Sequence, residues 1–201
     1  MLKTDMIKAK IIPPELCQRV QVPWDWNEIK IQPNSQCMDC MYHDLMYCIS
    51  KEFNLKTLYP GSVQNYMAVF FGTFKSIFGV YPRREKFFSS IYHNAVINEI
   101  LNKNNIPVKI KRLSTNNLDF AIQKLLETKR VVGVSMNSAV GRHMILILSI
   151  SSDNLFCSDY FGKNPYNLIK KGGHYHYNKK ELSINSVIWI EDENFKGDSK
   201  K

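Results

Sequence analysis

The residues that could do chemistry in this chain begin with a cysteine at the start of a predicted helix. Apolar residues recur every three to four positions over residues 39–51, which predicts an amphipathic helix with Cys40 in its first turn. The unpaired backbone N–H groups of a helix N-terminus favour negative charge and lower the pKa of a thiol there. Because only the thiolate attacks a carbonyl, Cys40 is the candidate nucleophile.

His143 and Asp159 are the candidates for the base that activates this thiol and for the group that orients the base. His143 precedes an apolar strand predicted over 144–150, and Asp159 follows another over 154–158, with a turn between them. The start of one strand and the end of its partner are neighbours in a hairpin. The sequence therefore predicts an imidazole–carboxylate contact at one edge of a sheet, as a Cys-His-Asp triad requires.

The other predicted elements divide the chain into a helical first half and a sheet-forming second half. The prolines and tryptophans of residues 13–34 predict an extended lead-in strand, and the segment from Glu191 to Lys201 is expected to fray. Helices are predicted over 62–78 and 85–103 and after a cap at Thr115 or Asn116, and further strands over 108–113, 131–136 and 187–190. Helices followed by an antiparallel meander indicate one α+β domain.

The order of these pieces resembles the bacteriocin-processing-type (C39-like) cysteine peptidases of the papain-like superfamily. The pieces are Val22-Pro23, Asp39-Cys40 opening a helix, the stretch from Leu118 to Val134, and Gly141-Arg142-His143 before an apolar strand with an aspartate sixteen residues later. The resemblance covers about residues 20–190. It implies a bacterial or phage protein with a papain-like fold, a helical half packed on an antiparallel sheet. An arm over 1–19, a domain over 20–191 and a flexible tail over 192–201 would follow.

The resemblance also implies a mechanism in which Cys40 attacks a carbonyl while a histidine first holds and then delivers the proton. Family members carry a glutamine six positions before the cysteine that donates into the oxyanion hole. Asn34 stands at that offset, so Asn34 or Gln36 would serve together with the Cys40 backbone N–H. The chain departs from the family at Met41, where a glycine usually follows the nucleophile, and at Tyr160, where a proline usually follows the aspartate.

Other interpretations of the same residues stay open. An acyltransferase would use the same triad, and a catalytically silent member would act as a papain-like binding protein. Cys37-x-x-Cys40 with His43 also favours zinc if His174 and His176 supply a second half-site, although the stretch around these two is equally expected to be a surface turn. A redox role for the paired cysteines lacks the strand before the helix that such sites need.

Composition limits the classes of partner. The formal charge of +9, from 27 basic and 18 acidic residues, favours polyanions such as an anionic cell-wall polymer, beside the expected peptide or protein substrate. Basic and aromatic residues are not interleaved as on a nucleic-acid platform, so no specific nucleic acid is expected. We expect neither a metal nor any other cofactor.

The cysteines and the apolar runs indicate the cellular compartment in which the protein is expected. Five cysteines at irregular spacing in a chain of 201 residues make a disulfide framework unexpected. The first ten residues do not resemble an export signal, and no apolar run approaches the roughly 20 residues that span a bilayer. The sequence therefore predicts a soluble protein made in the cytoplasm, with release by lysis or a dedicated exporter still open.

Overall fold

The structure is a computed structural model that describes residues 36–55, 63–82, 89–138, 141–159 and 173–193. Its helices are α1 (Gln36–Glu52), α2 (Val63–Phe78), α4 (Ser90–Lys103) and α5 (Leu118–Thr128), with a short 3-10 turn at Lys179–Glu181. Its strands are β1 (Val108–Leu113), β2 (Val132–Ser138), β3 (Gly141–Ile150), β4 (Asn154–Asp159), β5 (Gly173–Asn178) and β6 (Ile184–Asp192).

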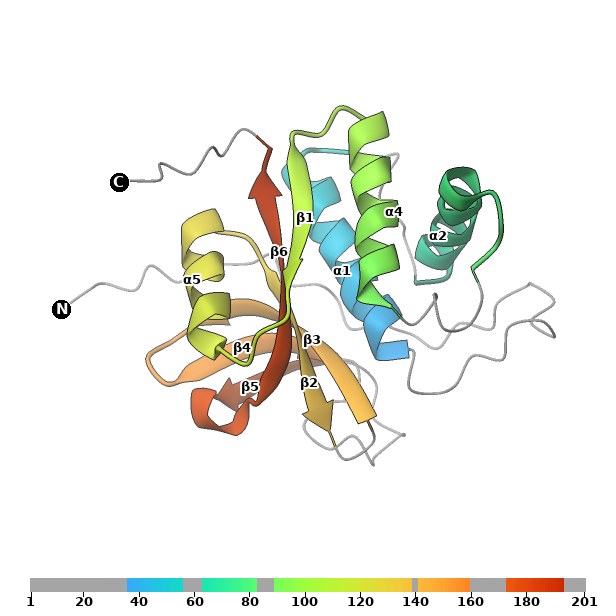
Figure 1. Cartoon of the computed structure of the whole chain (residues 1–201). Coiled ribbons are helices and arrows are strands. Elements are labelled where there is room, and N and C mark those ends of the chain that lie inside the picture. Colours follow the sequence, from blue (N-terminus) through green and yellow to red (C-terminus); the bar gives the residue numbers. More distant parts are fainter. Residues whose placement is uncertain (1–35, 56–62, 83–88, 139–140, 160–172, 194–201) are drawn as a thin grey trace, which may run out of the picture.

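The six strands form one antiparallel sheet in the order β1-β6-β2-β3-β4-β5. Figure 1 shows α5 on one side of this sheet and α1 and α4 on the other, with α2 outside them. The chain is therefore an α+β protein in which most of the helical first half covers one face of the sheet formed by the second half.

Side chains of β3 alternate between two separate apolar clusters, one on each face of the sheet. Met144, Leu146 and Leu148 pack with α1, whereas Ile145 and Ile147 belong to the cluster on the α5 side. Because both faces are covered, the strand is apolar along nearly its whole length. This explains why β3 appears in the sequence as a continuous apolar run.

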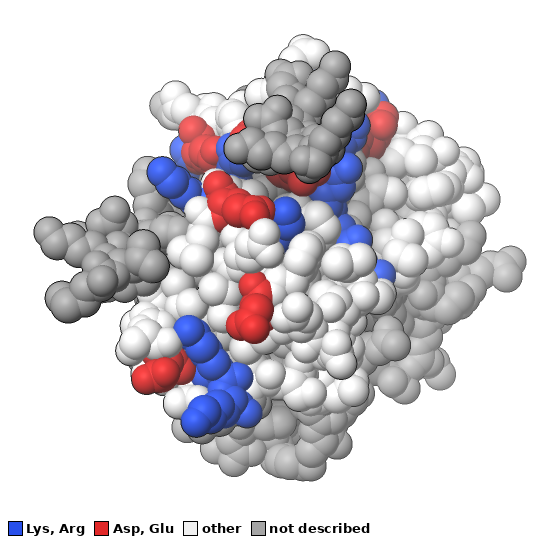
Figure 2. All heavy atoms as spheres, turned by 60° about the vertical axis from the view of Figure 1, so that its left-hand side comes forward, with Lys and Arg blue, Asp and Glu red and all other residues white. Residues whose placement is uncertain are grey.

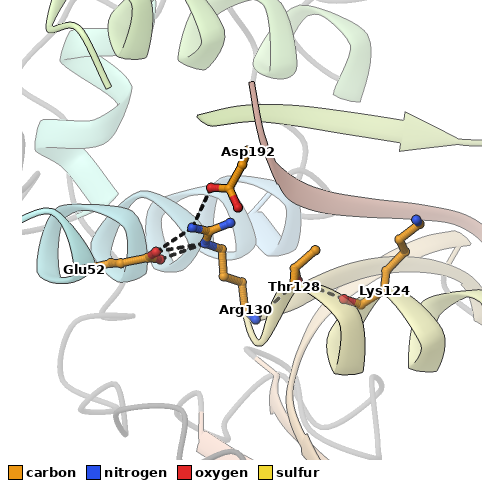
Figure 3. Close-up of polar contacts among 5 residues, drawn as sticks. All are labelled: Glu52, Lys124, Thr128, Arg130 and Asp192. Atoms are coloured by element: carbon orange, nitrogen blue, oxygen red, sulfur yellow. Dashed lines mark hydrogen bonds and ion pairs between the residues drawn. The ribbon is translucent and has the colours of Figure 1, made fainter. Parts of the chain in front are cut away.

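Arg130 joins the end of α1 to the end of the sheet where β2 begins and β6 finishes (Figure 3). Its guanidinium lies 2.7 Å from a carboxylate oxygen of Glu52, at the end of α1, and 2.9 Å from one of Asp192, at the end of β6. Burial lowers the pKa of Arg130, but these two carboxylates outweigh it and hold the pKa above its usual value. Because α1 ends here, it begins toward the opposite end of the sheet, where β2 ends and β3 starts.

Most predicted elements are present, and three expectations are wrong. The stretch around His174 and His176 is not a surface turn, because residues 173–178 pair with β4 as the edge strand β5. Helix α5 is capped by Asn117, whose side-chain oxygen accepts the N–H groups of the second and third helical residues. Glu191 does not begin a frayed tail, because β6 remains paired with β1 through Asp192.

Some expectations fall on residues that the structure does not describe. Two of them lie wholly outside the described residues, the lead-in strand over 13–34 and the arm over 1–19. For the predicted helix over 85–103, only the part from residue 89 onward is described. Within that helix, α4 begins at Ser90. The end of the predicted tail, from residue 194 onward, is likewise outside the described ranges.

Candidate functional site

His143 and Asp159 form a buried hydrogen-bonded pair at the open end of the β3–β4 hairpin. Nε2 of His143 lies 2.7 Å from Oδ1 of Asp159, and the two residues are only 4% and 1% exposed. The contact expected from the hairpin geometry is therefore present. Since a carboxylate only accepts, the proton is assigned to Nε2, and Nδ1 is the nitrogen with a lone pair.

Tyr177 on β5 completes this arrangement from the edge of the sheet. Its hydroxyl donates a hydrogen bond to Oδ2 of Asp159, so the two carboxylate oxygens have different partners. Tyr177 is itself buried within the apolar cluster on the α5 side. The three side chains come from three neighbouring strands, β3, β4 and β5, and form a continuous hydrogen-bonded chain.

Because successive side chains of a strand point to opposite faces, His143, Asp159 and Tyr177 lie on the face of the sheet away from α1. Cys157, two residues before Asp159, belongs to the α5-side cluster, as does Ile145 two residues after His143. Ser158 has the opposite orientation, and its hydroxyl donates to Asp44 of α1 at 2.9 Å. A thiol carried by α1 would therefore have to meet His143 around the ends of the strands, because it cannot reach it through the sheet.

The contact between α1 and β4 indicates how far Cys40 lies along the strand direction of the sheet. Asp44 contacts Ser158, which pairs with Leu146 of β3. Cys40 lies one helical turn, about 6 Å, beyond Asp44 toward the start of α1. His143 lies three residues, about 10 Å, beyond Leu146 toward the start of β3. Both therefore lie beyond this contact, toward the same end of the packed α1–β3 pair.

The structure describes the predicted site residues unequally. His143 and Asp159 are described in full. Cys40 and Gln36 lie in α1, but their side chains are outside the described part of the structure, and Asn34 precedes the first described residue. The structure thus brings the base and the orienting carboxylate together, and it gives the helix of the predicted nucleophile without the thiol itself.

Met41 occupies the position where the C39-like pattern has a glycine, and it packs closely against the sheet. A Cβ added to Gly133 of β2 would lie 2.8 Å from the Met41 sulfur and 3.4 Å from Cβ of Ile188. The absence of a side chain at Gly133 leaves the room that Met41 fills. This departure from the family pattern therefore has a packing partner in the chain.

Two of the other cysteines are unsuited to be nucleophiles. Burial, with the charges of Asp44 and Glu52, raises the pKa of the Cys48 thiol to about 12. Burial and the charge of Asp159 raise the pKa of the Cys157 thiol well above its usual range. Both thiols are protonated at neutral pH and inert as nucleophiles.

His43 is the one described histidine of the alternative zinc site, and it is fully buried. Its Nδ1 lies 3.0 Å from Oδ1 of Asp44, while its Nε2 has no hydrogen-bond partner among the described residues. Among the side chains that the structure describes, no three His, Cys, Asp or Glu residues gather as metal ligands would. The side chains of Cys37, His174 and His176 lie outside that search.

Tyr177 and Asp44 are the polar residues around the site that sequence reasoning missed. Tyr177 lies in the strand that was expected to be a turn, and its place beside Asp159 depends on β5 pairing with β4. Asp44 could have been noticed because a carboxylate inside an otherwise apolar helix face needs a partner. Its actual partners, His43 and Ser158, are apparent only from the packing of α1 on β4.

The described residues carry no net charge, because their basic and acidic side chains are equal in number. The whole excess of +9 therefore belongs to the other segments. Figure 2, which turns the α5 side forward, shows lysines and arginines interleaved with acidic residues. None of the described helices has the length and apolar character that crossing a bilayer requires.

Comparison with known proteins gives no assignment. A scan of protein-family models finds none that matches this chain, and a search of curated proteins likewise finds no match.

Proposed function

We propose that this chain is a cysteine hydrolase, in the first place a peptidase, in which Cys40 is the nucleophile. His143 is the general base and acid, and Asp159 orients the imidazole. The observation that carries the proposal is the buried 2.7 Å hydrogen bond between Nε2 of His143 and Asp159. In a thiol hydrolase this bond leaves Nδ1 to take the proton from the thiol and later deliver it to the leaving amine.

Two further observations support Cys40 as the sulfur involved. Burial raises the pKa of the partly buried Cys48 thiol and of the buried Cys157 thiol, which leaves the first turn of α1 as a better place for a thiolate. The tie between Glu52 and Arg130 directs the start of α1 toward the end of the sheet where β3 begins. The proposed site lies at this end of the sheet, where the start of α1 and the start of β3 come toward each other.

The papain-like fold and the C39-like family are part of the same proposal. A central helix packed on an antiparallel sheet, with a His–Asp pair at the strand ends, is the architecture that the resemblance implies. Asn34 or Gln36, with the backbone N–H of Cys40, would stabilise the oxyanion. The proposed substrate is a peptide or protein, and the basic segments outside the described residues favour one carried on an anionic polymer.

The test is alkylation of the folded protein with iodoacetamide at pH 6, followed by peptide mapping. An ordinary thiol is almost entirely protonated at this pH, so only an activated cysteine reacts quickly. We expect Cys40 to be the labelled residue. His143→Gln should slow its labelling by about tenfold or more, because the imidazolium that stabilises the thiolate is lost.

His43→Gln is the matched control, because His43 is also a buried histidine paired with an aspartate and lies three residues from Cys40. Labelling that depends on His43 and not on His143 would overturn the proposed triad. Cys40→Ala should abolish any peptide hydrolysis and leave the melting temperature close to that of the wild type. Absence of Cys40 labelling in the folded protein would instead favour a catalytically silent binding protein.

A further inference from the structure

Tyr177 is a buried polar residue to which the proposed reaction assigns no part. It is 6% exposed, lies on the edge strand β5, and points its hydroxyl at Oδ2 of Asp159. Oδ1 of the same carboxylate accepts the bond from His143. A tyrosine used only for packing would not need to share a buried carboxylate with a histidine.

We propose that Tyr177 is a positioning residue of the site, which holds the Asp159 carboxylate in the rotamer that accepts the His143 Nε2–H. Its part in catalysis rests on the proposed function, because it acts on the thiol only through Asp159 and His143. The geometric claim, that Tyr177 controls the His143–Asp159 pair, does not depend on any activity.

A buried carboxylate needs donors on both oxygens, since each oxygen withdrawn from water loses its hydration. Bonds to a charged acceptor are stronger than those between neutral groups. With both oxygens bound, the carboxylate also cannot rotate about its Cβ–Cγ bond without breaking one of the two hydrogen bonds. Tyr177 thus supplies negative-charge stabilisation and orientation at once, from a strand that neither His143 nor Asp159 occupies.

The proton affinity of the pair is the property that Tyr177 should change. When the hydroxyl is removed, the negative charge on Asp159 is less stabilised, so the His143–Asp159 pair binds its proton more tightly. The titration midpoint observed at the His143 ring should therefore move to higher pH. Only part of the energy of the lost bond reaches the His143 ring, because the bond is made to Asp159, so we expect a shift of about 0.3–0.5 pH unit.

Three other titratable groups lie near the pair among the described residues. Cys157 on β4 lies on the same face and is a protonated thiol across the range of the experiment. Asp44 and His43 of α1 lie on the other face, where Asp44 contacts Ser158. Because Asp44 contacts Ser158, the neighbour of Asp159, the titration of His43 must be followed separately from that of His143.

The experiment is an NMR titration of histidine-labelled full-length protein, comparing the wild type with Tyr177→Phe. Tyr42→Phe is the matched control, because Tyr42 is also a buried tyrosine and its hydroxyl donates to another residue, Asn94 of α4, at 2.6 Å. The His143 signal is assigned with His143→Gln, and the His43 signal with His43→Gln. Melting temperatures are measured for both tyrosine variants.

We expect Tyr177→Phe to raise the His143 midpoint by about 0.3–0.5 pH unit and Tyr42→Phe to leave it unchanged, even if both lower the melting temperature. An unchanged midpoint in a folded Tyr177→Phe protein would overturn the inference. The same variants are then alkylated with iodoacetamide. A shifted midpoint in a protein whose Cys40 does not react would uphold the positioning of Asp159 by Tyr177 and reject the hydrolase.

Discussion

Cys48 and Cys157 differ from an active-site cysteine in the one property that decides thiol reactivity, the fraction of thiolate. Cys157 lies in the core and Cys48 is partly buried against it, and this burial disfavours the charged form. For Cys48, a pKa raised to about 12 keeps the thiol protonated at pH 7. Nearby carboxylates reinforce the effect because they repel the thiolate.

The first prediction is that these two cysteines stay unmodified in the folded protein. Iodoacetamide at pH 7 should leave Cys48 and Cys157 unlabelled over a time in which Cys40 reacts completely. The same reagent should label all three after unfolding in guanidinium chloride, which serves as the control. Peptide mapping that found Cys157 labelled in the native protein would contradict its burial.

Among single residues, the chain's types and spacing predicted His143 and Asp159 as a pair, because a hairpin brings them together whatever the rest of the fold does. The contact of Tyr177 with Asp159 could not be predicted in this way. Its hydroxyl reaches Asp159 only because β5 joins the sheet beside β4, and the segment before β5 gives no local sign of that pairing.

Helix α5 shows how a single side chain defines the start of an element. The side-chain oxygen of Asn117 accepts from the backbone N–H groups of Asp119, at 2.9 Å, and Phe120, at 3.4 Å. Thr115 in turn accepts from the Asn117 N–H, at 3.1 Å. Several neighbouring residues can cap a helix, so the sequence predicted the cap to within two residues and did not identify it.

The second prediction is that Asn117→Ala destabilises the protein by about 1 kcal/mol, the usual loss when an N-cap is removed. Asn116→Ala is the matched control, because Asn116 is exposed and is not the cap. Its free energy of unfolding should change by less than about 0.5 kcal/mol. Urea unfolding of both variants gives the measurement, and equal losses would show that the cap is assigned to the wrong asparagine.

Arg130 acts at the same scale, because it connects the ends of three elements. Its side chain is 13% exposed, while Glu52 and Asp192 are 39% and 53% exposed, so the pair energies are reduced by solvent. The bidentate contact with Glu52 still provides a geometry that a lysine cannot reproduce.

The third prediction is that Arg130→Met lowers the free energy of unfolding by about 1–2 kcal/mol at low salt and by less at 1 M salt. Arg130→Lys should recover only part of this, since the lysine ammonium lacks the planar fork. Lys109→Met, which removes the exposed contact with Glu193, is the control and should cost less than about 0.5 kcal/mol. A salt-independent loss would indicate that only the apolar stem of Arg130 matters.

At the scale of the whole molecule, the distance between α1 and the sheet depends on a glycine. Met41 of α1 fills the space above Gly133, so that the helix that carries Cys40 packs closely on β2. A side chain at this position would push the helical layer away from the sheet, or force Met41 out of its buried site. The proposed Cys40–His143 site would take one residue from each layer, so it would depend on this spacing.

The fourth prediction compares two glycine substitutions. Gly133→Ala should destabilise the protein by about 1–3 kcal/mol, because the new Cβ would lie 2.8 Å from the Met41 sulfur. Gly72→Ala is the control: this glycine lies within α2 with no atom near its added Cβ, so the change should stabilise by about 0.5–1 kcal/mol. Thermal unfolding of both variants tests the assignment, and a neutral Gly133→Ala would show that Met41 adjusts freely.

The charge of the molecule is also distributed at this scale. The described residues are neutral as a set, and on the face shown in Figure 2 both signs are interleaved. Attraction for an anionic partner, if it accompanies the proposed activity, therefore comes from segments other than the helices and strands described. The total of +9 did not reveal this, because a sum contains no positions.

The sequence by itself determined the α+β class, the helical and sheet-forming halves, and the contact between His143 and Asp159. These depend on apolar periodicity and on hairpin geometry, which are local properties of the chain. Only the tertiary structure decided that β5 is a strand, that Tyr177 shares the Asp159 carboxylate, and that this chain of side chains lies on the face away from α1. Edge pairing and layer packing join residues distant in sequence, and the energy of such contacts leaves no periodic signal along the chain.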